Sequence, residues 1–265
     1  MRRLIVVLIV FILLGGSLYT YFISPKTYSF KQYNYINSTI PSAMNGLKIA
    51  YLSDINIDDQ NSITRLEDII DELNNKPFDI LLFGGDLYDS TVIETKKVSS
   101  LLKSIHAPYG KLAILGEKDL ENQLEVTHIL NDGGFEVINN EVRPIYYKDT
   151  LFSLIAYTKD TQINKLKIPK KGIKICLSHQ PDTFNQTKGI VDLQLSGHSY
   201  GGTFYLPYVG ALHKFDGCQT YNHGQYNEKN STLIVSNGLS GPATFPYKIL
   251  APNQVVFITL KTSKQ

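Results

Sequence analysis

The stretches LKIAYLSDIN (residues 47–56) and DILLFGGDLYD (residues 79–89) decide the fold of this chain. Each begins with a short apolar run that ends abruptly in small residues and an aspartate, Asp54 in the first stretch and Asp86 in the second. Both runs are therefore predicted to be buried strands. Between them, apolar residues recur at helical spacing over 63–73, which predicts a helix that joins the two strands.

The rest of the chain continues this alternation and then changes to strands. Apolar periodicity predicts helices over 92–105 and 120–130, with a strand over 111–115 between them. Further along, the pattern predicts strands over 142–147, 151–157, 173–177, 193–195, 233–235 and 255–260. Strand–helix alternation followed mostly by strands is typical of an α/β domain with two facing sheets.

Polar side chains collect where the predicted strands end. In chain order they are Asp54 with Asn56, then Asp86, then Glu117-Lys118-Asp119, then His179, and then His198 with Tyr200. In α/β sheets, ligands bind beyond the carboxyl ends of the strands. Carboxylates and imidazoles that meet at one rim are typical metal ligands. Taken singly, an aspartate can cap a helix and a histidine can be structural, so the order of the whole set carries the prediction of a metal site.

The composition excludes several other classes of protein. The 265 residues are 43% hydrophobic and carry a net charge of only +2, which excludes a disordered chain. The even balance of 26 basic and 24 acidic residues argues against nucleic acid as a partner. Cys176 and Cys218 are the two cysteines, too few for a disulfide scaffold or a cysteine-built zinc site.

The N-terminal segment is predicted to lie outside the globular fold. An apolar run over 4–23 follows Arg2 and Arg3, and about 20 apolar residues suffice to span a bilayer. We therefore expect a transmembrane anchor over 1–23, a tether over 24–46, and a domain over 47–265 on the outer side of the cell membrane. A cleaved signal peptide is the alternative.

The ordered polar motifs resemble those of the calcineurin-like metallophosphoesterases, in particular their membrane-anchored bacterial branch. That family carries Asp-x-His, Gly-Asp-x-x-Asp, Gly-Asn-His-Asp/Glu, a lone His, and Gly-His-x-His. The corresponding segments here are Ser-Asp-Ile-Asn (53–56), Gly-Asp-Leu-Tyr-Asp (85–89), Gly-Glu-Lys-Asp (116–119), Ser-His-Gln-Pro (178–181) and Gly-His-Ser-Tyr (197–200). The resemblance extends over about 47–260 and implies a four-layer α/β sandwich, in which two facing mixed β-sheets are flanked by helices.

The resemblance also implies a ligand set, which this chain departs from at several positions. Two metal ions in the family share an aspartate that corresponds to Asp86. The first ion would take Asp54 together with Asn56 and Tyr200, which stand where the family has two histidines and are weak or lost ligands. The second ion would take Glu117, in place of an asparagine, with His179 and His198.

We therefore expect one firm metal site and one impaired or vacant site. The firm site combines carboxylate and imidazole donors and would take one divalent ion, with Mn, Zn or Fe as candidates. Lys118 occupies the position of the family's acid–base histidine. Lys118 could stabilise charge on a bound phosphate, or its ammonium could replace the missing ion by pairing with Asp54 or Asp86.

Two functions remain open from the sequence. The first is a metal-dependent phosphoesterase of reduced or altered activity at the outer face of the membrane, acting on a phosphate ester derived from lipid or cell wall. The second is a catalytically inactive relative that binds a ligand or a protein in the cleft that corresponds to the family's active site. The intact Asp86, Glu117, His179 and His198 favour the enzyme, whereas the substitutions at positions 56, 118 and 200 favour the binding module.

Overall fold

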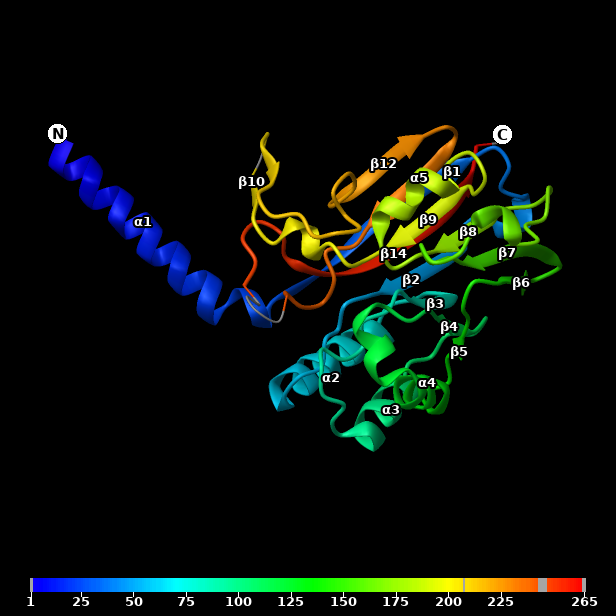
Figure 1. Ribbon diagram of the computed structural model, residues 1–265, viewed down its shortest axis with the longest axis horizontal. Helices are drawn as coiled ribbons and strands as arrows, with labels where there is room; N and C mark the ends of the chain where they lie inside the picture. The colour runs from blue at the N-terminus through cyan, green and yellow to red at the C-terminus, as the bar shows by residue number, and fades with distance from the viewer. Residues whose placement is uncertain (1, 207, 243–246, 264–265) are drawn as a thin grey trace.

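The computed structural model describes residues 2–206, 208–242 and 247–263, and it contains two six-stranded mixed sheets that face each other (Figure 1). In spatial order, the first sheet consists of β1 (Tyr28–Asn37), β14 (Asn253–Thr262), β2 (Lys48–Leu52), β3 (Ile80–Phe83), β4 (Lys111–Ala113) and β5 (Glu136–Val137). The second consists of β12 (Gly224–Glu228), β13 (Ser231–Val235), β9 (Leu193–Ser196), β8 (Lys174–Leu177), β7 (Thr150–Ala156) and β6 (Val142–Tyr147). The predicted two-sheet α/β fold is confirmed.

Helices cover the outer face of the first sheet. They are α2 (Gln60–Asn74), α3 (Thr95–Lys103) and α4 (Gln123–Asp132), which lie together beneath β2–β5 in Figure 1. The outer face of the second sheet has a thinner cover, which includes the one-turn α5 (Phe184–Thr187): its Phe184 packs in a buried cluster with Leu233 and Val235 of β13. Both sheets therefore have packed outer layers, although the two layers differ in thickness.

The alternation of side chains along each strand divides the core between the layers. In β2, Ile49 and Tyr51 enter the core between the two sheets, whereas Ala50 and Leu52 pack under the helices. All four side chains are fully buried. A strand that is apolar on both faces is what a central position in such a sandwich requires, because water reaches neither face.

The first sheet begins earlier in the chain than the predicted domain boundary at 47. β1 lies inside the segment predicted as a tether, and it pairs in parallel with β14 along its full length of ten residues. Its mixed polar and aromatic sequence, YSFKQYNYIN, hides the strand, because most of its side chains remain partly or fully exposed at the sheet edge.

The expectation of a membrane anchor is wrong. The apolar N-terminal segment does form a helix, α1 (Arg2–Phe22), which leads away from the body of the molecule in Figure 1. Across 2–206, 208–242 and 247–263, however, no helix combines the length and the apolar character that a bilayer crossing needs. The predicted single-pass location with an outward-facing catalytic domain is overturned with that expectation.

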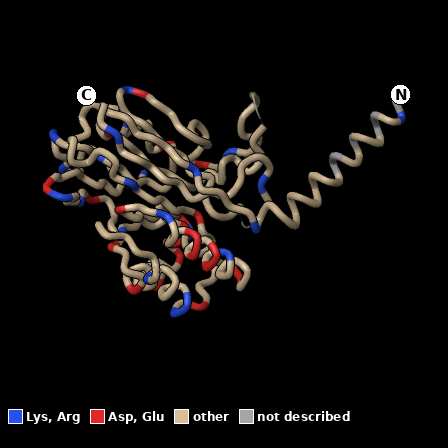
Figure 2. Tube along the Cα trace, turned by 180° about the vertical axis from the view of Figure 1, so that it is seen from behind, with Lys and Arg blue, Asp and Glu red and all other residues tan. Residues whose placement is uncertain are grey.

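Both signs of charge are spread over the globular body. Figure 2 shows Asp and Glu intermixed with Lys and Arg on the helices and on the loops that join the strands.

Candidate metal centre

Five loops bring the predicted ligands together at the carboxyl ends of the strands. Asp54 follows β2, Asp86 follows β3, Glu117 follows β4, His179 follows β8, and His198 follows β9. One group of facing ligand atoms comes from Glu117, His179 and His198, and a second comes from Asp54, Asp86 and His179. Within each group the atoms lie within 4.8 Å of one another. His179 belongs to both groups, so the five side chains converge on one small region.

The backbone at these turns is held in an uncommon conformation. Asp54, Asp86 and His198 have φ values of 53°, 58° and 66°, in the left-handed region that residues other than glycine seldom adopt. Such strain is kept at functional sites where the surrounding structure enforces it. Here the Asp54 carboxylate accepts the backbone N–H of His198 at 2.9 Å, and this bond ties the loop after β2 to the loop after β9.

Gly116 allows two of these loops to approach closely. A Cβ at this position would lie 2.1 Å from Asp86 Oδ1 and 2.7 Å from the Asp86 backbone nitrogen. No side chain can be accommodated there without displacing the aspartate. The glycine therefore lets the Glu117 loop pack directly against the Asp86 loop, and the two carboxylates can reach the same imidazole.

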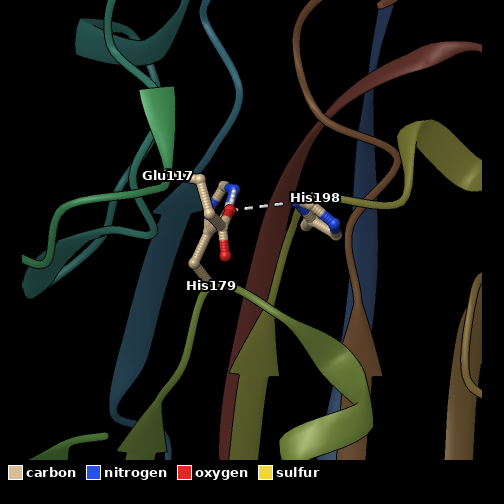
Figure 3. Close-up of side chains that lie close together, drawn as sticks. All are labelled: Glu117, His179 and His198. Atoms are coloured by element: carbon tan, nitrogen blue, oxygen red, sulfur yellow. Dashed lines mark ion pairs between the residues drawn. The ribbon is translucent and has the colours of Figure 1, made fainter. Parts of the chain in front are cut away.

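The Glu117 carboxylate lies between two imidazoles. Its Oε2 is 3.2 Å from His179 Nε2 and 3.1 Å from His198 Nδ1, and Figure 3 shows the three side chains pointing toward one another. Burial acts to raise the pKa of Glu117, but the charge of His179 and the hydrogen bond from His198 outweigh it and lower the pKa to about 2. The carboxylate is therefore anionic at neutral pH.

Each imidazole has one ring nitrogen within hydrogen-bond distance of a backbone carbonyl oxygen. His179 Nδ1 lies 2.6 Å from the carbonyl oxygen of Gly84, and His198 Nε2 lies 2.6 Å from that of Asp216. A ring nitrogen that donates to a carbonyl fixes the tautomer and leaves the other nitrogen with a lone pair for a metal. The free nitrogens, His179 Nε2 and His198 Nδ1, are the ones that face Glu117.

The environment of His179 fits a bound cation. Its Nε2 is buried without a hydrogen-bond partner, although it lies 3.2 Å from Asp86 Oδ2 and 3.9 Å from Asp54 Oδ1. Burial acts to lower the pKa of His179, but the negative charge of Asp86 and Glu117 raises it well above the ordinary value. Burial raises the pKa of Asp54, and His179 offsets this only in part. Anions crowded in a dry site favour a positive ion among them.

Asn56 and Tyr200, the two expected weak ligands, contact each other. Asn56 Nδ2 donates to Ser240 Oγ at 2.6 Å and lies 3.4 Å from the Tyr200 hydroxyl. Burial raises the pKa of Tyr200 well above its ordinary value, so its hydroxyl is a neutral phenol. A neutral phenol is a poor metal ligand compared with the phenolate or with imidazole.

Lys118 forms an ion pair that the sequence did not indicate. Its ammonium pairs with Asp89, the last residue of the 85–89 motif. The expected pairing with Asp54 or Asp86 is absent from the ion pairs of the residues that the structure describes. The backbone N–H of Lys118 nevertheless donates to Asp86 Oδ1 at 3.1 Å, so this residue helps to orient Asp86.

Sequence reasoning missed the structural role of Asp119. Its buried carboxylate accepts backbone N–H groups from Asp86 at 2.8 Å, Leu87 at 2.8 Å and Gly116 at 2.9 Å. It thereby clamps the loops that carry Asp86 and Glu117. Its position three residues after a glycine was visible in the sequence, but that spacing alone does not tell a ligand from a clamp.

A second missed residue is Lys248, which no motif marks. Its ammonium is buried beside the site, donates to the carbonyl oxygen of Asn237 at 2.5 Å, and lies 5.8 Å from the centre of the Tyr200 ring. Burial lowers the pKa of Lys248 to about 7, and the negative charge of Asp54 limits the decrease. Local sequence gives no signal for this residue, because the chain folds it back from far beyond the other motifs.

Comparison with known proteins identifies the family of this chain. Residues 47–201 match the family model described as calcineurin-like phosphoesterase. The chain is 28% identical to an uncharacterized metallophosphoesterase, YkuE, of Bacillus subtilis, over 94% of this chain and 91% of that protein. An uncharacterized metallophosphoesterase of Helicobacter pylori is 26% identical over 83% of this chain, which spans 61% of that protein's length. Among solved structures, GAP50 of Plasmodium superposes with a TM-score of 0.46 at 11% identity, over 80% of each chain.

Proposed function

The chain belongs to the calcineurin-like phosphoesterases, and on that premise we propose that it hydrolyses phosphate esters with one firmly held divalent metal ion. The observation that supports the proposal is the pair of ligand groups that share His179: one formed with Glu117 and His198, the other with Asp54 and Asp86. The family supports metal-dependent phosphoesterase activity in general. The single firm site and a reduced rate are the specific parts of the proposal.

The donor set is suited to a transition metal of intermediate softness. Asp86, Glu117, His179 and His198 would hold the ion, with Asp54 as a further carboxylate beside it. Imidazole together with carboxylate suits Mn, Zn or Fe, which are the candidates. When bound, such an ion supplies Lewis acidity toward a phosphoryl oxygen and activates water for attack.

The protein's own groups would orient this chemistry. His179 and His198 are fixed by the carbonyl groups of Gly84 and Asp216, so neither ring has to reorient when a ligand binds. The Asp119 clamp keeps Asp86 and Glu117 on adjacent turns. Preorganised donors of this kind lower the cost of binding charge.

Two features support a reduced rate. The position of the family's acid–base histidine carries Lys118, whose ammonium is engaged by Asp89 and is therefore a poor proton donor to a leaving group at neutral pH. Asn56 and Tyr200 offer an amide and a neutral phenol, so a second ion would be held weakly and could not share the stabilisation of charge. Lys118 remains a candidate for a positioning residue through its backbone bond to Asp86.

The substrate is a phosphate ester whose alcohol the family does not specify. A lipid- or wall-derived ester depends on a membrane anchor, and no helix among the described residues could cross a bilayer, so the proposal does not include this source.

A hydrolysis assay with simple esters tests the proposal. The full chain would be loaded with Mn, Zn or Fe and assayed with 4-nitrophenyl phosphate and bis(4-nitrophenyl) phosphate. We expect release of 4-nitrophenol that His198→Asn lowers at least tenfold. His128→Asn, an exposed histidine on α4, should leave the rate unchanged. If metal binds and no ester is hydrolysed, the alternative of a non-catalytic binding module replaces this proposal.

A further inference from the structure

A cavity of about 460 Å³ opens directly beside the candidate metal centre. Its lining includes Glu117 and His179, so one end of the cavity is formed by proposed metal ligands. We propose that this cavity binds the alcohol portion of the substrate and that this portion is apolar, an alkyl or aryl group. The inference rests on the proposed function, because it places the phosphate at the metal centre.

The walls that the alcohol would contact are mainly hydrocarbon. The cavity extends between the two sheets, where Ile138 and Ala156 form part of its lining and belong to the buried core. Leu115 and Leu120 line the side next to Glu117. The volume falls within the range of small-molecule sites, which are predominantly apolar with a few placed polar groups.

Some of the polar groups in the wall are paired with one another, although Lys159 and Asp160 also line the cavity. Asn140 Oδ1 accepts the backbone N–H of Thr158 at 2.9 Å, and Asn140 Nδ2 donates to Thr158 Oγ1 at 2.9 Å. On the neighbouring wall, Thr183 Oγ1 lies 2.8 Å from Ser178 Oγ. The paired groups offer a ligand little further hydrogen bonding, so a sugar or a glycerol would lose hydration along this part of the wall with little compensation.

An exposed leucine lies on the rim of the cavity. Leu120 follows the Glu117 turn, its side chain is 54% exposed, and it lines the opening. A large apolar side chain in this position would lose contact with water when an apolar ligand enters. Leu124, on the next turn of the chain, is 80% exposed and does not line the cavity, so it provides a matched control.

Binding of n-alkylphosphonates to the metal-loaded full chain tests the assignment. These probes cannot be hydrolysed, and their phosphonate end is nearly constant along the series. Each buried CH₂ strengthens binding by up to about fourfold, so the Kd measured by calorimetry should fall at least tenfold from ethyl- to hexylphosphonate. Leu120→Asn should make the fall in Kd from ethyl- to hexylphosphonate at least threefold smaller and leave the Kd of ethylphosphonate unchanged. Leu124→Asn should leave the full fall in Kd.

The outcomes separate this inference from the proposed function. A Kd that does not change with chain length, an equal effect of the two leucine variants, or no binding of any phosphonate would overturn the assignment of the cavity. A chain-length trend in a protein that hydrolyses no ester would sink the proposed function and leave the apolar cavity assigned. Hydrolysis of 4-nitrophenyl phosphate with no chain-length trend would support the proposed function and overturn the assignment of the cavity.

Discussion

Replacement of His179 should remove most of the stability that the protein gains from bound metal. His179 is the one side chain shared by both groups of facing ligand atoms, and its buried Nε2 has no hydrogen-bond partner. A ligand that binds only the folded state stabilises it by RT ln(1 + [L]/Kd). At a metal concentration of 100 Kd, the stabilisation of the unaltered protein is about 2.7 kcal/mol.

The size of the loss follows from the same relation. Removal of a group that only hydrogen-bonds to a metal ligand weakens metal binding by about 10- to 100-fold, so loss of a direct ligand should weaken it by about 100-fold or more. At the same metal concentration, His179→Asn would then gain only about 0.4 kcal/mol. The difference of about 2.3 kcal/mol corresponds to a metal-induced rise in Tm that is smaller by roughly 5–9 °C.

The assay is thermal unfolding of each protein with and without metal. The metal-induced rise in Tm is taken within each variant, so any destabilisation of the metal-free fold by the substitution is subtracted. His128→Asn, on the exposed side of α4, is the control and should show the full metal-induced increment. An equal increment in His179→Asn and in the control would refute the reasoning, since it would mean that the ion binds elsewhere.

Three further predictions concern residues around the centre. Lys118→Met should lower the free energy of unfolding by roughly 1–2 kcal/mol because it leaves the part-buried Asp89 unpaired, whereas metal stoichiometry should not change. Zero coupling energy with Asp89→Asn, measured in urea by a double-mutant cycle, would show that the ion pair does not stabilise the fold. Burial lowers the pKa of Lys248 from 10.5 to about 7, so this lysine binds its proton more weakly in the folded than in the unfolded state. The charged lysine therefore destabilises the folded state most strongly below pH 7, and this destabilisation fades toward pH 10.5. The stability of Lys248→Met relative to the unaltered protein, measured in urea, should therefore be higher at pH 6 than at pH 9 by roughly 2–3 kcal/mol, and no pH dependence would contradict this account. Asn56→His combined with Tyr200→His should bring the bound metal closer to two ions per chain by elemental analysis, and an unchanged count would mean that imidazoles at these positions do not restore the second site.

The convergence of the candidate ligands could be predicted because each one follows a strand that ends abruptly. The apolar run before Asp54 is buried on both faces as β2, and the turn after it places the carboxylate at the rim. The same logic holds for Asp86, Glu117, His179 and His198, whose strands lie side by side in two sheets. For these residues, the local sequence pattern and the topology of the sheet indicate the same place, the rim where the strands end.

Contacts between distant loops could not be predicted in this way. The pairing of Lys118 with Asp89, and the burial of Lys248 beside Tyr200, depend on how loops fold over one another after the sheets have formed. β1 was missed for a different reason: an edge strand with exposed side chains has little of the apolar patterning on which strand prediction relies.

Metal stoichiometry tests the central claim most directly. The full chain would be stripped with a chelator, reconstituted with Mn, Zn or Fe, freed of excess metal and analysed for bound metal per polypeptide. We expect one ion per chain, lost on replacement of His179 and retained on replacement of His128. Two ions per chain would contradict the single firm site, and no bound ion would contradict the metal centre itself.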